Sequence, residues 1–223
     1  TKQIPMYNYS NSINISKFRK IINFKDKKIN SIYLLLSSCP RYHRSFSASH
    51  TSSEILIHLK EIIIFLRLLP KDFIVTIRCA KNDYKWNIKN RILEHKYKCK
   101  ILIDEGENNF LDQLKTYDLI ISNYFGTTHL ESMASNIPTM ILYNPTKEMF
   151  SENMHKLVNR LNNVNIAHTS AEKMYNFIMS IRNMPREWWE SKDLQNALKE
   201  YNRKFSNVDE NWFNKWLNKL EID

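Results

Sequence analysis

The chain has 223 residues, 43% of them apolar and 12% aromatic, which suits one large α/β domain or one domain with a helical appendage. Its formal net charge of +10 favours anionic ligands or anionic membrane surfaces, and no motif for binding RNA or DNA accompanies the basic residues. Three widely spaced cysteines and seven scattered histidines give neither a disulfide framework nor a metal-binding pattern. With no signal peptide and no apolar run of roughly 20 residues, we expect a soluble cytoplasmic protein that contacts the inner face of the plasma membrane at most peripherally.

Residues 1–30 contain no recognisable domain, and we interpret them as a linker or the remnant of a preceding domain. Because the chain begins with Thr1, we expect an amino-terminal domain of the same protein to precede it. Residues 31–183 are expected to form a Rossmann-like nucleotide-sugar-binding domain, and residues 184–223 a helical tail.

Strands and helices alternate from residue 31 to residue 182, the pattern of a parallel sheet wrapped by helices. The expected strands are residues 31–37, 73–78, 100–104, 119–122, 139–143 and 164–167. The expected helices are residues 51–69, 86–95, 110–115, 149–161 and 171–182, with one more that begins at Thr127 or Thr128. The sequence therefore predicts an α/β fold in which a Rossmann-like parallel sheet carries helices on both faces.

The expected tail is rich in aromatic residues. They recur at spacings that mostly suit one apolar helix face: Trp188, Trp189, Tyr201, Phe205, Trp212, Phe213 and Trp216. This pattern favours packing in a core over a platform for stacking nucleic-acid bases. In a two-domain enzyme such a tail would pack on the other domain.

The strongest functional signal is the polar turn after the strand at residues 119–122. The turn runs from Ser122 to Gly126, and a helix begins at Thr127 or Thr128. Gly126 is one of only two glycines in the chain, and a glycine here allows the backbone to approach a ligand closely. Because the first amides of a helix are unsatisfied and lie at the positive end of its dipole, the turn predicts an anion site.

Glu131 follows one helical turn later and can accept hydrogen bonds from a ribose diol, which indicates a nucleotide or nucleotide-sugar site. A second interpretation stays open. Thr128-x-x-Glu131 also has the spacing of a capping box, in which the two side chains satisfy the helix-end amides and bind nothing.

Other polar residues follow the strand ends, where parallel sheets bind their ligands. Four segments are expected to meet there: residues 39–50, 78–86, 104–109 and 122–131. His43 and Arg44 bring an imidazole and a guanidinium to the first strand end, and Arg78 and Asp83 add charge near the second. Guanidinium groups suit phosphate or carboxylate, whereas the alternative for each segment is an ordinary solvated loop.

Together these motifs resemble the carboxyl-terminal half of the surface-carbohydrate transferases first noted in leptospiral O-antigen gene clusters. The similarity spans about residues 40–220 and rests on residues 78–86, Asp104-x-Gly106, residues 122–138, Tyr143-Asn144-Pro145, and Trp188-Trp189 to Trp216. Its most specific part is Thr127-Thr-x-x-Glu-Ser-x-Ala-x-Asn-Ile-Pro-Thr139. The family resembles GT-B glycosyltransferases, which implies that this chain binds the sugar donor and that a preceding domain binds the acceptor.

The resulting hypothesis is a metal-independent glycosyltransferase for bacterial surface polysaccharide, with a nucleotide-activated and possibly CMP-linked sugar as donor and no cofactor. The acceptor would be a glycan or a lipid-linked glycan. Thr127, Thr128 and nearby amides would hold the donor phosphate, Glu131 the ribose, and Arg78 or Arg44 the charge that develops on the leaving group.

The remaining assignments and the rival functions complete the hypothesis. Ser122, Gly126 and Asp83 complete the expected donor site, and His43 is assigned with Arg78 to catalysis. His129 is a second candidate for proton transfer, although a structural role is favoured for it. The alternatives are a CMP-polyol-phosphate transferase, a non-catalytic nucleotide- or glycan-binding module and, last, a nucleic-acid-binding protein, which the absence of any such motif disfavours.

Overall fold

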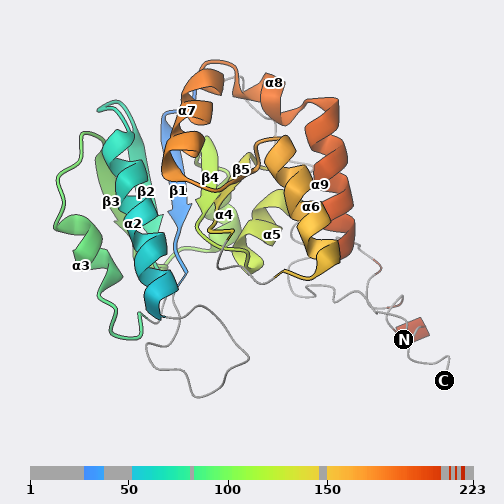
Figure 1. The fold of residues 1–223 in the computed structure, drawn as a ribbon, viewed down its shortest axis with the longest axis horizontal. Coiled ribbons are helices and arrows are strands. Elements are labelled where there is room, and N and C mark those ends of the chain that lie inside the picture. The colour runs from blue at the N-terminus through green and yellow to red at the C-terminus, as the bar shows by residue number, and fades with distance from the viewer. Residues whose placement is uncertain are drawn as a thin grey trace.

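The computed structural model describes residues 28–37, 52–80, 83–145 and 150–206, together with residues 211, 214, 217 and 218. In this part of the chain, six strands form one sheet in which every neighbouring pair is parallel (Figure 1). The strands are β1 (Ser31–Leu35), β2 (Ile74–Arg78), β3 (Lys100–Asp104), β4 (Leu119–Ser122), β5 (Thr139–Leu142) and β6 (Ala167–His168). Their order across the sheet is β3-β2-β1-β4-β5-β6, so the direction of winding reverses between β1 and β4. This is the Rossmann order, and it confirms the predicted fold class.

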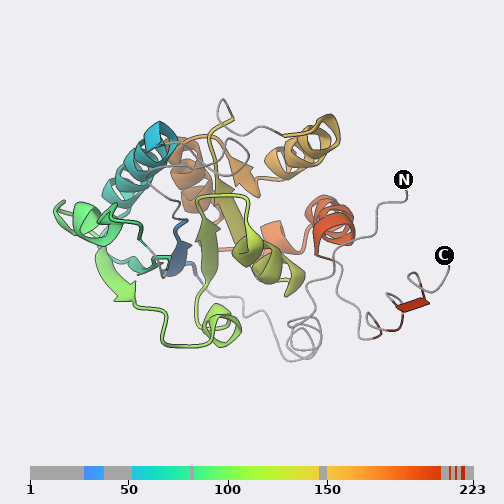
Figure 2. The same cartoon turned by 90° about the horizontal axis from the view of Figure 1, so that it is seen from below.

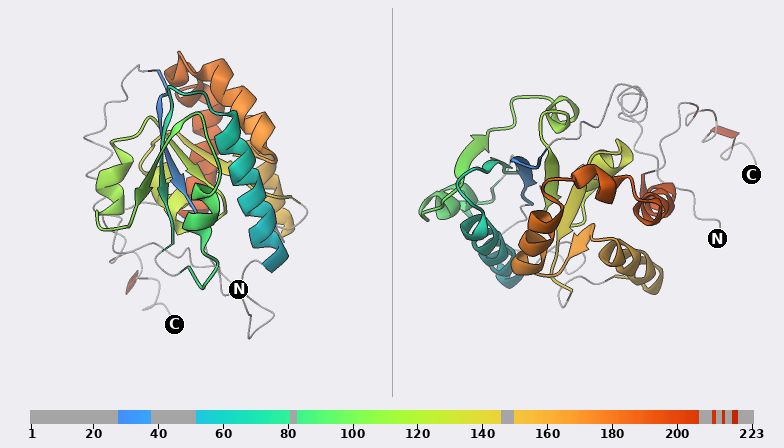
Figure 3. Two further views of the ribbon diagram at one scale, coloured as in Figure 1. Left: turned by 90° about the vertical axis from the view of Figure 1, so that its left-hand side faces the viewer. Right: turned by 90° about the horizontal axis from the view of Figure 1, so that it is seen from above.

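The helices lie on both faces of the sheet, as the sequence predicts (Figures 2 and 3). They are α2 (Ser52–Leu68), α3 (Ile88–Leu93), α4 (Phe110–Leu114), α5 (Thr127–Ala134), α6 (Glu152–Asn163), α7 (Ala171–Ile181), α8 (Pro185–Trp189) and α9 (Lys192–Phe205). Strand β1 shows why two layers form, because alternate side chains of a strand point to opposite faces. Ile32 and Leu34 pack in the same core cluster as α2 and α7, whereas Tyr33 and Leu35 pack with α4 and α5.

The amino-terminal ends of the two central strands are tied together by Asp118. Its Oδ2 atom accepts hydrogen bonds from the Ser31 amide at 2.8 Å, the Asn30 amide at 3.0 Å and the Ser31 hydroxyl at 2.7 Å. Because Asp118 directly precedes β4, these bonds fix β4 beside β1. The opposite, carboxyl ends of the same strands then meet where the winding reverses.

The tail helices α8 and α9 pack on α5 and α6 within the same molecule. Trp189 and Tyr201 are both 1% exposed, which confirms core packing for these two aromatic residues. Trp212, Phe213 and Trp216 lie outside the described residues. The division of the chain at residue 184 stays a prediction, and the described part of the tail packs on this domain.

One predicted strand is displaced. The sequence predicts residues 164–167, whereas β6 comprises Ala167–His168. The reason is local, since α6 extends to Asn163, Val164 is its C-cap, and Asn165 adopts a left-handed conformation with φ 58°. No helix in the described part of the chain is long and apolar enough to cross a membrane.

Candidate functional site

A pocket of about 210 Å³ opens at the carboxyl ends of the central strands, beside the start of α5. It lies where the winding of the sheet reverses between β1 and β4, the position at which open α/β sheets bind ligands. Its lining combines strand ends with the turn before α5: Leu35, Leu36, Ser37, Arg78, Cys79, Ala80, Gly106, Tyr124 and Thr128.

The turn before α5 positions Tyr124 against Gly126. Gly126 is the N-cap residue of α5 and has an extended backbone, with φ −137° and ψ −164°. A Cβ atom at this position would lie 1.8 Å from Cε2 of Tyr124, so any other residue would displace the tyrosine ring. The sequence predicts that Gly126 gives a ligand access to the backbone. In the structure the space beside the glycine is filled by Tyr124, which itself lines the pocket.

The structure tests one of the two interpretations of Thr128, the capping box. Because α5 begins at Thr127, Thr128 is the second residue of the helix and cannot be its N-cap, so the capping-box interpretation is wrong. The Gly126 amide donates instead to Nδ1 of His129 at 2.9 Å. Thr128 lines the pocket, and its Oγ1 lies 3.1 Å from the Tyr124 hydroxyl. Glu131 is half-buried one turn further along α5 and is not among the residues that line the pocket.

His129 is buried beneath the start of α5. Burial lowers the pKa of its imidazole to about 3, so the ring is neutral at physiological pH. Since Nδ1 accepts a hydrogen bond from Gly126, the proton lies on Nε2, which donates to the Tyr201 hydroxyl at 3.0 Å. These contacts make His129 a structural link between α5 and α9 and leave it no role in proton transfer.

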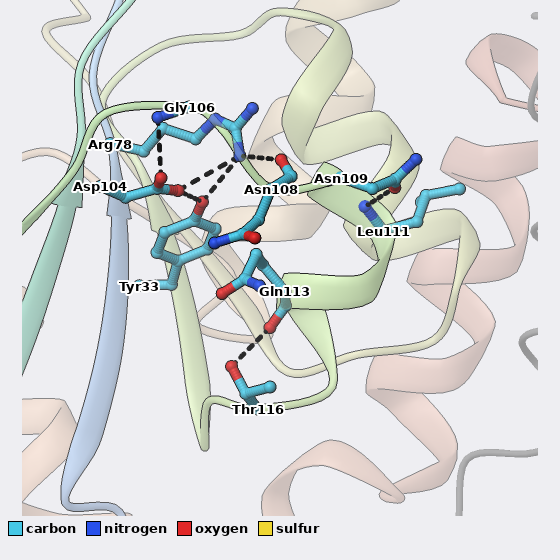
Figure 4. A network of polar contacts seen from close by, with 9 residues as sticks. All are labelled: Tyr33, Arg78, Asp104, Gly106, Asn108, Asn109, Leu111, Gln113 and Thr116. Atoms are coloured by element: carbon cyan, nitrogen blue, oxygen red, sulfur yellow. Dashed lines mark hydrogen bonds and ion pairs between the residues drawn. The ribbon is translucent and has the colours of Figure 1, made fainter.

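Arg78 enters the pocket from the end of β2 and is held by a polar network (Figure 4). Its Nη1 donates to the Tyr33 hydroxyl at 3.0 Å, to Oδ2 of Asp104 at 3.2 Å and to the Asn108 carbonyl at 3.3 Å. The Tyr33 hydroxyl also donates to Oδ2 of Asp104. The structure therefore places the predicted cation at the site, but with a carboxylate beside it.

Cys79, the next residue, also lines the pocket. Burial, with a smaller contribution from the carboxylates of Asp83 and Glu105, raises the pKa of its thiol to about 11. The thiol is therefore protonated at neutral pH and is no nucleophile. Within the described residues, no group of three or more His, Cys, Asp and Glu side chains is placed to hold a metal ion.

Two of the predicted donor-site residues are engaged in local structure. The Ser122 hydroxyl is fully buried and donates to the Tyr124 carbonyl at 2.8 Å. The Asp83 carboxylate accepts hydrogen bonds from the amides of Asn87 and Ile88 at the start of α3. Neither residue lines the pocket. His43 and Arg44 lie outside the described residues, and their roles stay predictions.

Sequence reasoning missed Tyr33 and Tyr124. The missed signal at Tyr33 is chemical, because a tyrosine within an apolar, buried strand needs a partner for its hydroxyl. Asn123 was also missed. Its buried Oδ1 accepts a hydrogen bond from the Ser37 amide at 2.9 Å and so joins the ends of β1 and β4. An Asn directly after a strand end could have indicated this contact.

Comparison with known proteins assigns the family. Residues 7–220 match the sequence model of the LIC12162 family transferases. This match covers nearly the whole chain, so the chain belongs to the LIC12162 family of transferases. The assignment confirms the resemblance on which the sequence analysis relied. No curated protein matches the chain.

Two solved structures match this chain at low sequence identity. A variant of the wall teichoic acid polymerase TagF is 13% identical, with a TM-score of 0.44, and the match covers 96% of this chain and 47% of that one. MurG of Acinetobacter baumannii is 14% identical, with a TM-score of 0.45, and the match covers 88% of this chain and 52% of that one. The chain thus spans about half the length of these structures.

Proposed function

We propose that this chain is the donor-binding domain of a glycosyltransferase that uses a nucleotide-activated sugar, with a CMP-linked sugar as the first donor to test. One observation carries the proposal. The pocket at the reversal of the sheet combines the Arg78 guanidinium with the first turn of α5 at Thr128. In Rossmann-like sheets this crevice binds nucleotides, and the family to which the chain belongs is one of transferases.

The two positive groups of the pocket suit a departing nucleotide phosphate. Negative charge develops on that phosphate as the bond to the sugar breaks, and fixed cations and amides lower the energy of that state. The guanidinium of Arg78 and the amides of the first turn of α5 are such groups. The proposed reaction assigns this task to the protein itself and is metal-independent.

The pocket is large enough for only part of the proposed donor. Its volume of about 210 Å³ is below the roughly 300–1,000 Å³ of pockets that enclose a whole small ligand. The proposal therefore seats the phosphate in the pocket, with Thr127 and Thr128 beside it. Glu131 meets the ribose, and the sugar lies at the mouth.

The wider setting is part of the same proposal. The acceptor is a glycan or lipid-linked glycan of a bacterial surface polysaccharide such as O-antigen, and the acceptor site is completed by another domain of the same protein. We assign the reaction to the cytoplasm, at the inner face of the plasma membrane. The net charge of +10 supports this setting, because it attracts the protein to anionic lipid.

The test is calorimetric titration of the purified protein with CMP, UDP, GDP and ADP, followed by a CMP-linked sugar and CDP-glycerol. We expect one nucleotide to bind selectively, and its sugar-linked form to bind at least as tightly. Thr128→Val and Glu131→Ala should each weaken that binding by about threefold to tenfold, the effect of one lost hydrogen bond.

Matched controls are Thr116→Val and Glu172→Ala, which alter an exposed threonine and an exposed glutamate away from the pocket. Both should bind like the unaltered protein. Absence of binding by every nucleotide, or equal losses in the site and control variants, would contradict the proposed function. Preference for CDP-glycerol would favour the polyol-phosphate transferase instead.

A further inference from the structure

The buried hydroxyl of Tyr33 is the most informative group that the proposed function does not use. Tyr33 is fully buried in the middle of β1, and the other residues of that strand from Ile32 to Leu35 are aliphatic. Burying a hydroxyl in an apolar core is unfavourable unless it is hydrogen-bonded. Here it accepts from Nη1 of Arg78 and donates to Asp104 (Figure 4).

The ring of Tyr33 is held as firmly as its hydroxyl. It stacks on Tyr117 with ring centroids 4.5 Å apart and an interplanar angle of 3°, and more loosely on Phe110 at 6.2 Å. The hydroxyl therefore has one position at the end of the sheet. Burial raises the pKa of Tyr33 well above its ordinary value, so the hydroxyl keeps the proton that it donates to Asp104.

Asp104 is fixed from two sides. It pairs with Arg78 in the register of β2 and β3, and its Oδ1 accepts a hydrogen bond from the Gly106 amide at 2.8 Å. Gly106 has φ +80°, a left-handed conformation that favours glycine, and this turn brings its amide back to the carboxylate. The side chains of Arg78 and Asp104 are only 18% and 10% exposed, so their contact is shielded from water.

The contacts of the Arg78 side chain engage one edge of the guanidinium, and the other edge lies beside Gly106, which lines the pocket. Within the described residues, the hydrogen bonds of the Arg78 side chain to Tyr33, Asp104 and Asn108 are all made by Nη1. Nη2 lies on the side of Gly106, 3.8 Å from the position that a Cβ atom would take there, and Gly106 lines the pocket. In Figure 4 this nitrogen is directed away from Tyr33 and Asp104.

We propose that Tyr33, together with Asp104, is a positioning residue: the two side chains hold Nη1 of Arg78 so that Nη2 meets the donor phosphate in one fixed orientation. This inference rests on the proposed function. Because Asp104 offsets part of the charge of Arg78, directed hydrogen bonding adds to the electrostatic contribution of the guanidinium. A guanidinium with a fixed edge loses less entropy when it binds phosphate.

The test compares Tyr33→Phe with Tyr117→Phe. The first removes the hydroxyl of the network and keeps the stacked ring, and the second removes a hydroxyl of the same stacked pair that makes no contact in the network. Affinities for CMP, UDP, GDP and ADP, and for their four nucleosides, are measured by calorimetry. We expect Tyr33→Phe to weaken nucleotide binding by about threefold to tenfold, to leave nucleoside binding within twofold, and Tyr117→Phe to change neither.

The same change is then made in an Arg78→Ala background. If Tyr33 acts through Arg78, its loss should alter nucleotide affinity there by less than twofold, because the group that it positions is gone. Equal weakening in both backgrounds, or parallel loss of nucleoside and nucleotide binding, shows a merely structural role and overturns the inference. So does unchanged nucleotide binding by Tyr33→Phe. If the unaltered protein binds no nucleotide, the proposed function fails, and the inference with it.

Discussion

His129 joins the first turn of α5 to α9 through both of its ring nitrogens. The same histidine fixes the amide of Gly126, the residue at which the helix starts. Its neutral state is therefore a condition for the geometry of the pocket edge formed by Thr128. A residue that the sequence offers for proton transfer is, in the structure, part of the scaffold of the site.

The buried imidazole makes the stability of the protein depend on pH. The pKa of His129 is about 3 in the folded state, against an ordinary value of 6.5 in the unfolded chain. Between these two pH values the unfolded chain therefore binds a proton that the folded chain does not. The free energy of unfolding should consequently fall as the pH falls below 6.5, by about 1.4 kcal/mol per pH unit from this residue. His168, whose pKa burial lowers to about 4, should add to the fall.

Urea unfolding from pH 7.5 to pH 4.5 measures this dependence. His129→Gln should flatten the slope below pH 6.5 by about 1.4 kcal/mol per unit, because the titrating group is absent. The exposed His155→Gln is the control and should keep the original slope. An unchanged slope in His129→Gln would show that the imidazole is already protonated in the folded protein.

At the scale of elements, α9 packs against α5 and holds it in place. Met133 and Ile141, from α5 and β5, pack in one cluster with Leu194, Leu198 and Tyr201 of α9. The side chain of Asn202 also donates to the Met133 carbonyl at 3.1 Å. The helix that carries Thr127 and Thr128 is therefore held in place by contacts with the tail helix α9.

This packing predicts that α9 belongs to the cooperative unit of the sheet. Leu198→Ala should lower the free energy of unfolding by about 2–5 kcal/mol in a single transition, because it leaves a cavity in a buried cluster. The neighbouring exposed Lys199→Ala should change it by less than about 0.5 kcal/mol. Urea unfolding monitored in parallel by tryptophan fluorescence and by circular dichroism shows whether α9 and the sheet unfold together. Non-coincident transitions would mean that the tail is a separate unit.

At the scale of the whole molecule, the net charge of +10 gives the longest-range interaction with ligands and surfaces. We expect it to attract both the nucleotide of the proposed reaction and anionic lipid. The two attractions differ in their response to salt. A phosphate held by fixed, partly buried donors is screened less than lipid head groups at an exposed surface.

The expected consequence is salt-sensitive binding to membranes. The protein should sediment with phosphatidylserine-containing vesicles at low salt and be released at about 0.5 M salt, where the screening length falls to a few ångströms. Vesicles of phosphatidylcholine alone are the control and should not bind it. Binding to both kinds of vesicle, or binding that salt does not weaken, would contradict an electrostatic contact with the membrane.

Local patterns predicted most elements because their causes are local. Five strands and the start of α5 lie where the short apolar segments and the turn at Gly126 predict them. The sixth strand was misplaced because Asn165, a residue that tolerates left-handed backbone, extends the turn after α6. The capping box was ambiguous because the sequence does not show whether the helix begins at Thr127 or at Thr128. Thr128 could act as the N-cap only if the helix began after it.

By itself the sequence determined the alternation of strands and helices, the Rossmann-like class and the membership of a transferase family. Only the tertiary structure decided which side chains meet. Tyr33, Arg78 and Asp104 are separated by 45 and 26 residues and belong to three strands, yet they form one network. Likewise Tyr201 of α9 reaches His129 across 72 residues. Contacts of this kind depend on strand order and helix packing, which bring distant segments together and leave no periodic pattern in the chain.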